Sequence, residues 1–307
     1  ASLAKHLDLD VTAMHAAHGT LPLRVPKRWL DKIPPGELNH PLLRQVLPLQ
    51  QEVVHTPGYS TDPLQENQSN PAAGLLHKYP GRVLLITAPS CAIHCRYCFR
   101  RHFPYNDNQP SQTDWNKPLD YIRSDPSITE VILSGGDPLM LKNKTLEALL
   151  RKIDDIEHIN TVRFHSRMPV VLPERIDSDF LSLCKSLRCN KVMVIHSNHA
   201  LEIDKEVEKK LHELKETNMQ LLNQSVLLAG VNDKLETLLT LSKRLWTCAT
   251  LPYYLHMPDK VAGTAHFDVS LAKAKSLIEG MRQTLPGYLV PKLAQENPGE
   301  SGKTIIA

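Results

Sequence analysis

The sequence predicts an α/β fold in which a parallel sheet curls into a partial barrel. From residue 82 onward, short apolar runs alternate with amphipathic segments whose apolar residues recur at helical spacing. The alternation repeats six times, and units of this kind join parallel strands by right-handed crossovers. Six units are too few for a closed eightfold barrel. We therefore expect a partial (β/α)6 barrel of the TIM type, with reactive groups on the loops at the carboxyl ends of the strands.

Each expected strand is a short apolar run, and each is followed by one expected helix. Asp204 and Asp233 suit the N-termini of the fourth and fifth helices, and Pro173 suits the start of the third. The expected strands cover residues 83–87, 130–133, 161–165, 191–196, 220–224 and 250–255, and the expected helices cover 114–124, 144–157, 174–187, 204–217, 233–246 and 269–284.

Two flanking segments lack this alternation. Residues 1–80 are rich in prolines that interrupt helical patterns, which predicts an N-terminal extension of short helices and loops. A partly disordered stretch over 58–72 is the alternative for part of it. The end of the chain has no convincing helical pattern. We therefore divide the chain into the N-terminal extension (1–80), the partial barrel (81–285) and a C-terminal tail (286–307).

The composition argues against several classes of function. Of the 307 residues, 41% are hydrophobic and 22% are charged, which is typical of a globular protein. A formal net charge of +3 is too small to favour nucleic acid or a membrane surface as a partner. No apolar run has the length of a membrane span, and there is no signal-peptide core, so we expect a cytoplasmic protein.

Three cysteines lie within eight residues, directly after the first expected strand. Cys91, Cys95 and Cys98 have the spacing C-x3-C-x2-C, and closely spaced thiolates are good ligands for an iron–sulfur cluster. Three thiolates on a 4Fe–4S cube leave one iron open to a ligand from outside the protein. The sequence therefore predicts a cluster with an open corner, on the reactive face of the barrel.

Zinc and disulfides are weaker alternatives for these cysteines. Structural zinc usually takes four protein ligands in two pairs, and no second pair lies nearby, although His94 falls between the first two cysteines. A disulfide framework does not suit a chain of 307 residues with six cysteines. We interpret Cys184, Cys189 and Cys248 as ordinary buried thiols.

A second motif follows the second expected strand. Ser134, Gly135, Gly136 and Asp137 form a run whose two glycines permit close approach of the backbone to a ligand. Alone, a glycine pair usually marks only a turn. One strand–helix unit after the cysteines, however, the run resembles the motif with which radical S-adenosylmethionine (SAM) enzymes bind SAM. The cysteine spacing resembles the cluster signature of the same superfamily.

Further segments make this resemblance more specific. Residues 76–85, 223–233 and 252–255, with two arginines after the cysteines, are similar to the lysine 2,3-aminomutase family, and the similarity covers about residues 75–304. Residues 88–105 most resemble the member that supplies (R)-β-lysine for the modification of elongation factor P. The resemblance implies an isomerase that converts L-α-lysine into β-lysine. It also implies a 4Fe–4S cluster, SAM and pyridoxal 5′-phosphate (PLP), an external electron donor, and a functional link to elongation factor P and its lysyl ligase.

The resemblance also implies where PLP binds. The family's glycine-rich segment ends in the lysine that binds PLP covalently, and it matches residues 298–303, which end in Lys303. Glu300 and Ser301 replace two of its glycines. The same segment resembles the end of a nucleotide-binding loop, but Asn297 stands where that motif needs glycine. The family's residues around the PLP phosphate match Lys78, Tyr79 and Arg82, where fixed cations suit a dianion.

The remaining family contacts concern lysine and SAM. Arg100 matches the arginine that binds the substrate carboxylate. Asp259 and Glu296 match two aspartates that bind the distal ammonium, and Glu296 is one methylene longer. His196 and Gln224 match contacts on the SAM side, although a histidine that ends a strand is often only a core polar group. Without the resemblance, each charged residue would be interpreted as an ordinary surface residue.

Two alternatives for the function remain open. The chain could act on another amino acid, such as glutamate or ornithine, or it could be a non-catalytic iron–sulfur scaffold that transfers electrons or binds a partner. The assembly is open as well. No cysteine follows Cys248, so a homo-oligomer that depends on the family's C-terminal zinc-binding cysteines is not assumed.

Overall fold

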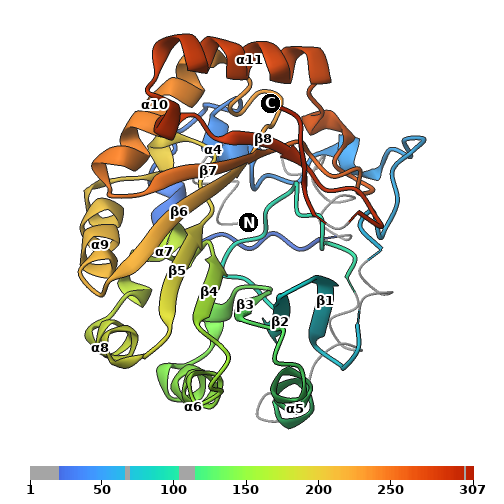
Figure 1. Ribbon diagram of the computed structural model, residues 1–307. Helices are drawn as coiled ribbons and strands as arrows, with labels where there is room; N and C mark the ends of the chain where they lie inside the picture. Colours follow the sequence, from blue (N-terminus) through green and yellow to red (C-terminus); the bar gives the residue numbers. More distant parts are fainter. Residues whose placement is uncertain (1–20, 66–69, 104–114, 301) are drawn as a thin grey trace.

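A computed structural model describes residues 21–65, 70–103, 115–300 and 302–307. These residues contain a nine-stranded sheet whose spatial order is the order along the chain. Strands β2 to β8 are parallel to their neighbours, whereas β1 and β9 are antiparallel edge strands. The predicted α/β fold with a curled, mostly parallel sheet is confirmed (Figure 1). The strands are β1 Leu75–Tyr79, β2 Arg82–Ala88, β3 Glu130–Gly135, β4 Thr161–Ser166, β5 Asn190–Ile195, β6 Met219–Val226, β7 Leu251–His256, β8 Lys292–Gln295 and β9 Thr304–Ile305.

The helices that follow β2 to β7 lie on the outside of the sheet (Figure 1). Their buried residues recur at helical spacing, as Leu146, Leu149, Leu150 and Ile153 do in α6, so each helix covers the sheet with one apolar face. The main helices are α5 Asn116–Ser124, α6 Asn143–Asp154, α8 Ser178–Ser186, α9 Lys205–Lys215, α10 Leu235–Thr247 and α11 Leu271–Thr284.

The predicted helix starts are partly correct. Asp204 caps α9 by accepting hydrogen bonds from the backbone N–H groups of its first turn. Asp233 does not cap α10, whose N-cap is Lys234. The carboxylate of Asp233 accepts a hydrogen bond from Gly230 N instead. Pro173 begins the 3-10 turn η5 (Pro173–Arg175), and α8 starts later, after its cap Asp177.

Three strands were not predicted. Strand β8 extends the parallel sheet beyond β7, and β9 returns antiparallel along β8, with Ala294 opposite Ile305. Strand β1 lies on the other edge, and an ion pair between Lys78 of β1 and Glu296 after β8 links the two edges. The tail therefore closes back on the site that the first strands form.

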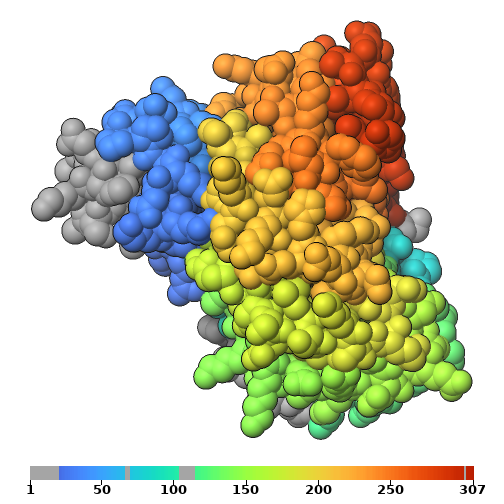
Figure 2. Space-filling view, turned by 90° about the vertical axis from the view of Figure 1, so that its left-hand side faces the viewer, coloured from blue at the N-terminus to red at the C-terminus, as the bar shows by residue number. Residues whose placement is uncertain are grey.

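The described part of the N-terminal extension packs against the barrel. Trp29 and Leu42 belong to the same hydrophobic core as Leu75 and Phe164 of the sheet. Figure 2 shows this part, in blue, along one side of the body. Of the stretch 58–72, residues 66–69 lie outside the described residues. The short elements of the extension are α3 Lys27–Leu30, α4 Pro41–Arg44 and η2 Gln50–Val53; those of the barrel and tail are η4 Pro138–Met140, α7 Met168–Val171, η6 Ala200–Glu202, η7 Ala265–Phe267 and η8 Gly287–Leu289.

None of the helices that the structure describes combines the length and the apolar character that crossing a bilayer requires.

Candidate active site

The predicted cluster ligands lie on the loop after β2, at the carboxyl end of that strand. Burial raises the pKa of Cys98 to about 11. The pKa of Cys91 is also raised, by burial first and then by Asp137 and the other two thiols. The three thiols are therefore close enough to influence one another's charge. A bound metal would have to displace their protons.

The donor set suits an iron–sulfur cluster better than a single ion. Among the described residues, no group of three His, Cys, Asp or Glu side chains is placed to hold one metal ion. A 4Fe–4S cluster makes a different demand, because each thiolate binds its own iron. Three half-buried thiols from one loop meet that demand. Cys184, Cys189 and Cys248 are buried and free, as predicted.

The glycine pair holds the cysteine loop against the end of β3. A Cβ on Gly136 would lie 2.3 Å from the carbonyl oxygen of Ser90, so only glycine fits there. Gly135 has a φ of 108°, and its Cβ would lie 2.8 Å from a methyl carbon of Ile86. The backbone that approaches these glycines most closely is thus the protein's own. Their predicted contact with SAM stays a prediction.

Asp137 joins the ends of two strands. Its buried carboxylate accepts hydrogen bonds from Ser166 Oγ at 2.7 Å and Arg167 N at 2.8 Å, beyond β4. It also accepts from Leu139 N at 3.0 Å, within its own loop. Burial raises the pKa of Asp137, although these hydrogen bonds oppose the rise. The four-residue motif therefore fixes the cysteine loop on one side and the loop after β4 on the other.

The tail brings Lys303 to Glu296. Lys303 Nζ lies 2.6 Å from Glu296 Oε2, and Lys78 Nζ lies 2.7 Å from Glu296 Oε1. The Tyr79 hydroxyl donates to Glu296 Oε1 at 3.0 Å, and the Arg82 guanidinium lies 4.8 Å from the centre of the Tyr79 ring. Five residues predicted from three separate segments thus meet in one place.

Lys78, Tyr79 and Lys303 hold the Glu296 carboxylate, and Arg82 lies on the Tyr79 ring; these four residues form an anion cradle. Burial alone would raise the pKa of Glu296, but Lys303 and Lys78 hold it well below its usual range. The carboxylate stands in for an anion held by two ammonium groups and a hydroxyl. A phosphate dianion also binds to cationic groups and hydrogen-bond donors, so these residues fit the phosphate of PLP.

The other predicted substrate contacts lie on the same face of the barrel. Arg100 is buried, stacks on the ring of Phe99 at 4.7 Å and donates to Ser134 Oγ at 3.3 Å. Asp259 lies after β7, where its carbonyl oxygen accepts from Val261 N at 2.8 Å. The structure thus brings Arg100 to Ser134, of the motif predicted to bind SAM, and its substrate contact stays a prediction.

His196 and Gln224 are neighbours at the ends of β5 and β6. His196 Nε2 lies 2.8 Å from the hydroxyl of Tyr97, and its ring also bonds to the backbone of Gln224. Removal from water lowers the pKa of His196, so the imidazole is neutral at pH 7. The amide of Gln224 is half-buried and makes no side-chain hydrogen bond within the described part of the chain. It is thus available to a ligand.

Two histidines near Lys303 were not predicted. Burial, and then Lys303, lower the pKa of His256 to about 3. His165 is also kept neutral by burial, with Arg163, Lys303 and Arg100 as the next causes of its lowered pKa. Both lie at the carboxyl ends of strands, where reactive groups gather, and that position was the available signal.

Buried charges fasten the cysteine loop to the N-terminal extension. The carboxylate of Glu52 in η2 pairs with Arg96 and Arg101, which flank the last cysteine. The Arg96 side chain is 0% exposed and that of Arg101 is 1% exposed. A surface cavity of about 310 Å³ lies beside this contact, lined by residues 52–56, Tyr59, Arg101, His102, Ala262 and Gly263. Glu52 and Arg101 in the lining of this cavity pair with each other, whereas the residues predicted to bind cofactors and substrate lie at the ends of the strands.

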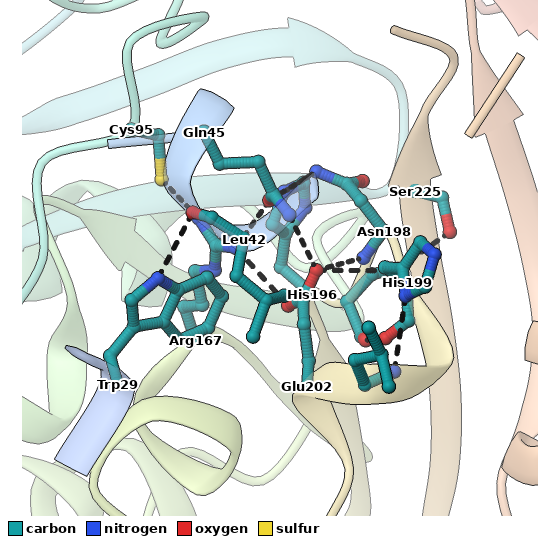
Figure 3. A network of polar contacts seen from close by, with 12 residues as sticks. Trp29, Leu42, Gln45, Cys95, Arg167, His196, Asn198, His199, Glu202 and Ser225 are labelled. Carbon is teal, nitrogen blue, oxygen red and sulfur yellow. Dashed lines mark hydrogen bonds and ion pairs between the residues drawn. The ribbon is translucent and has the colours of Figure 1, made fainter. Parts of the chain in front are cut away.

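A more deeply placed network links the cysteine loop with the ends of β4 and β5. Arg167, which follows β4, donates to Cys95 Sγ at 2.6 Å and to Glu202 Oε2 at 3.1 Å (Figure 3). Gln45 from the N-terminal extension accepts from the same guanidinium at 2.7 Å. No motif in the sequence indicated this network, because its members are scattered over the chain.

Comparison with protein families gives one match. Residues 85–241 match the model of the radical SAM superfamily. That superfamily is defined by a 4Fe–4S cluster and SAM, which agrees with the cysteine loop described above.

Several curated proteins are similar over nearly the whole chain. The L-lysine 2,3-aminomutase of Haemophilus influenzae is 45% identical, and the match covers 99% of this chain and 91% of that protein. The L-lysine 2,3-aminomutase of Escherichia coli is also 45% identical, over 98% of this chain and 89% of that protein. The protein of the same name from Clostridium subterminale is 36% identical, over 94% and 69%. A solved radical SAM methyltransferase from Sphaerobacter thermophilus has a TM-score of 0.48 at 16% identity, over 72% of this chain and 68% of that one.

Proposed function

This chain belongs to the lysine 2,3-aminomutase family of the radical SAM superfamily, and on that premise we propose that it converts L-α-lysine into β-lysine. The observation that carries the proposal is the Glu296 carboxylate, which is held between the ammonium groups of Lys78 and Lys303. The distal group of a lysine substrate is an alkylammonium of the same kind. Glu296 therefore already binds the chemical group that the substrate would present.

The cofactors supply the bond-breaking chemistry, and the protein supplies placement. When bound, the cluster and SAM supply a carbon-centred radical that takes a hydrogen atom from the substrate, and PLP supplies a π system through which the amino group moves from Cα to Cβ. The chain must hold these groups in register and keep water away from them. In this proposal Cys91, Cys95 and Cys98 hold the cluster, and Ser134, Gly135, Gly136, Asp137, His196 and Gln224 form the SAM side.

We propose that the anion cradle holds PLP. Lys78, Tyr79 and Arg82 would bind the phosphate, and the amine of Lys303 would bind PLP covalently. Lys303 Nζ donates to Glu296 Oε2 at 2.6 Å, so it must leave this contact when PLP binds. The ammonium of the substrate would then replace that of Lys303 on Glu296.

The charges define a ligand with a carboxylate at one end and a cation at the other. Arg100 would bind the α-carboxylate, whereas Asp259 and Glu296 would bind the distal ammonium. A glutamate substrate would place its side-chain carboxylate against these two acids, and like charges in a dry pocket cost roughly several kcal/mol. We therefore favour lysine over glutamate. Ornithine is the closer alternative, because it keeps the ammonium and is only one methylene shorter.

We further propose that the product is (R)-β-lysine and that it serves the modification of elongation factor P through its lysyl ligase. Support comes from residues 88–105, of which 104–105 lie outside the described residues. The enzyme would work in the cytoplasm with an external one-electron donor. Direct contact with elongation factor P is not part of the proposal.

The decisive test is anaerobic reconstitution with iron, sulfide, PLP, SAM and dithionite, followed by chiral analysis of the products. We expect L-lysine to give β-lysine and L-glutamate to give no product. A matched pair of variants checks the radical route: Cys95→Ala should be inactive and Cys184→Ala active. Absence of methionine release from SAM would favour the scaffold alternative, and faster turnover of glutamate or ornithine would reassign the substrate.

The acidic side of the pocket can be tested apart from the radical chemistry. Asp259→Asn removes one charge from the distal end, so we expect lysine turnover to fall about tenfold or more. SAM cleavage should fall far less, because Asp259 is assigned to the substrate alone. Equal losses in both rates would contradict the assignment. The elongation factor P link is tested by adding the reaction products and the ligase to elongation factor P and measuring its intact mass.

A further inference from the structure

A buried ion pair lies beneath the cysteine loop, and none of the roles assigned above uses it. Arg167 is 7% exposed and Glu202 is 0% exposed, so both charges are out of water. Arg167 Nη2 lies 3.1 Å from Glu202 Oε2. Burying two charges is costly, and packed apolar residues could fill the same space at no loss of stability. The pair therefore calls for an explanation other than stability.

The guanidinium of Arg167 is held through both of its terminal nitrogens, whereas its buried Nε has no hydrogen-bond partner among the described residues. Nη2 donates to Gln45 Oε1 at 2.7 Å and to Glu202, while the carbon of the guanidinium lies 4.8 Å from the centre of the Trp29 ring. Its backbone N–H donates to Asp137 at 2.8 Å. Figure 3 shows Arg167 between Trp29, Gln45 and Glu202, with one end directed at Cys95. A side chain fixed in this way has a single orientation.

That orientation aims one nitrogen at a predicted cluster ligand. Arg167 Nη1 donates to Cys95 Sγ at 2.6 Å. Cys98 is bonded differently, since it accepts a hydrogen bond from the backbone of Arg100. Arg101, which follows the same loop, directs its guanidinium at Glu52 and at backbone carbonyls instead. The cation that touches a sulfur is thus Arg167.

Glu202 offsets part of the charge of Arg167 by pairing with Nη2, the nitrogen that does not contact Cys95. Its Oε1 accepts from Asn198 N at 2.9 Å, His199 N at 3.0 Å and Gln45 Nε2 at 3.0 Å. These hydrogen bonds fix the carboxylate in place. The sulfur of Cys95 therefore experiences a cation whose field is partly offset by a fixed anion.

Hydrogen bonds to the sulfur ligands, local charge and burial set the reduction potential of an iron–sulfur cluster. A reduced cluster carries one more negative charge than the oxidised one, so a donor and cation at a ligating sulfur favour the reduced form. We propose that Arg167 is a positioning residue that raises the reduction potential of the cluster held by Cys91, Cys95 and Cys98, and that Glu202 limits this rise. One electron passes from the external donor to the cluster; no bond breaks and no proton moves in this step. The inference rests on the proposed function.

The test is the midpoint potential of the reconstituted enzyme, measured without SAM by titration with dithionite and electron paramagnetic resonance of the reduced cluster. For Arg167→Gln we expect a more negative potential. At a fixed poise the ratio of reduced to oxidised cluster should fall about tenfold, which is about 59 mV for one electron. Glu202→Gln leaves the cation unopposed, so its potential should move in the opposite direction. Arg167→Lys keeps the charge and should lie between Arg167→Gln and the wild type.

Arg24→Gln is the matched control. Arg24, in the N-terminal extension, donates to the carbonyl oxygen of Cys91 at 3.0 Å, so the variant removes an arginine that contacts the cysteine loop without touching a sulfur. Its charge is exposed and screened by solvent, and we expect the wild-type potential. Iron and sulfide content, measured for each variant, shows whether the cluster is complete.

Every outcome of these measurements either supports or overturns the inference about Arg167 and Glu202. Arg167→Gln and Glu202→Gln with full iron content and unchanged potentials would overturn the inference and leave the proposed function intact. If Arg167→Gln binds no cluster, Glu202→Gln and Arg167→Lys decide, and shifts in any direction other than those above refute it. A wild-type protein that binds no cluster would refute the proposed function, and the inference with it.

Discussion

The cysteine loop and the C-terminal tail carry the reactive attachment points of the site, and the protein holds them by different means. The loop is tied down by buried charges: Arg96 and Glu52 have side chains that are both 0% exposed. The tail is held by the two-residue strand β9 and by the pair between Lys303 and Glu296, whose side chains are 26% and 16% exposed. The loop is therefore anchored deeply and the tail near the surface.

This difference suits the two tasks. Removing one partner of a buried pair typically costs about 3–5 kcal/mol, so the loop has one arrangement under all ordinary conditions. Partly exposed pairs are worth about 1 kcal/mol or less, so the tail can exchange partners. The proposed role of Lys303 requires such an exchange, whereas the proposed cluster requires fixed ligands. The predictions below test each side of this contrast.

The largest expected effect is on the cluster. Changing Cys91, Cys95 or Cys98 to Ala removes the ligand of one iron, so we expect the cluster absorbance and the bound iron and sulfide to be lost. The same change at Cys184, Cys189 or Cys248 should leave both unchanged, because these thiols are buried elsewhere. If a buried thiol proved necessary for the cluster, the open-corner assignment would be wrong.

The second effect concerns the tail alone. Lys303→Ala removes the amine that we assign to PLP, so aminomutase activity should be lost while the cluster is retained. Borohydride reduction of the wild type followed by peptide mapping should place the pyridoxyl group on Lys303. A label on Lys78 or Lys292, with Lys303→Ala still active, would refute the assignment. Loss of the cluster in this variant would contradict the independence of loop and tail.

The sequence predicted the repeating part of the fold well, because the spacing of apolar residues indicates its strands and helices. The six predicted strands and helices are all present among the described residues. Strands β1, β8 and β9 were missed for a physical reason. They are short, and β8 and β9 contain Lys292, Gln295 and Thr304 among few apolar residues. Their pairing is decided by the edges of a sheet that local sequence does not describe.

The site was predictable where a motif concentrates it and hidden where contacts are long-range. The cysteine spacing and the glycine pair indicated one face of the barrel. By contrast, Gln45, Arg167 and Glu202 are more than 30 residues apart along the chain, and nothing local marks them as partners. Glu296 was expected to face a substrate ammonium, and its pairing with Lys303 depends on β9 turning back along β8.

A third prediction compares Gly136, which contacts the cysteine loop, with Gly302 of the C-terminal tail. Gly136→Ala places a Cβ 2.3 Å from the Ser90 carbonyl oxygen, so the cysteine loop must shift. We expect a loss of about 2–4 kcal/mol in the free energy of unfolding and weaker cluster binding. Gly302→Ala meets no atom within 4 Å, so it should change stability by less than about 0.5 kcal/mol. Denaturant titration measures both, and equal effects would contradict the contrast between the regions.

The two glycines of the tail differ in their backbone conformation. Gly299 has a φ of 82°, which glycine adopts most readily. Gly302 has open space around it and a φ outside the left-handed region. The turn therefore favours glycine at position 299, whereas neither the backbone conformation nor the surrounding space requires glycine at position 302.

The smallest expected effect is the pH dependence of the tail. Glu296 has a pKa well below its usual range because Lys303 and Lys78 outweigh the effect of burial. A lowered folded-state pKa stabilises the tail above the unfolded value of about 4.3, and this stabilisation is lost as the pH falls below that value and through the folded pKa. Since the group is partly exposed, we expect this stabilisation of the tail to be about 1 kcal/mol.

Hydrogen exchange of the Ile306 amide, which donates to Leu293 O at 2.8 Å, reports on the stability of the tail. At about pH 6, Glu296→Gln should speed this exchange roughly fivefold, after correction for intrinsic rates, and Glu279→Gln, which alters an exposed glutamate of α11, should not. As the pH falls below about 4.3, the difference between the wild type and Glu296→Gln should shrink progressively, and it should vanish only below the folded-state pKa of Glu296. Identical exchange in the two variants at about pH 6 would mean that β9 pairing alone holds the tail, and the contrast drawn between the loop and the tail would then rest on strand length instead of charge.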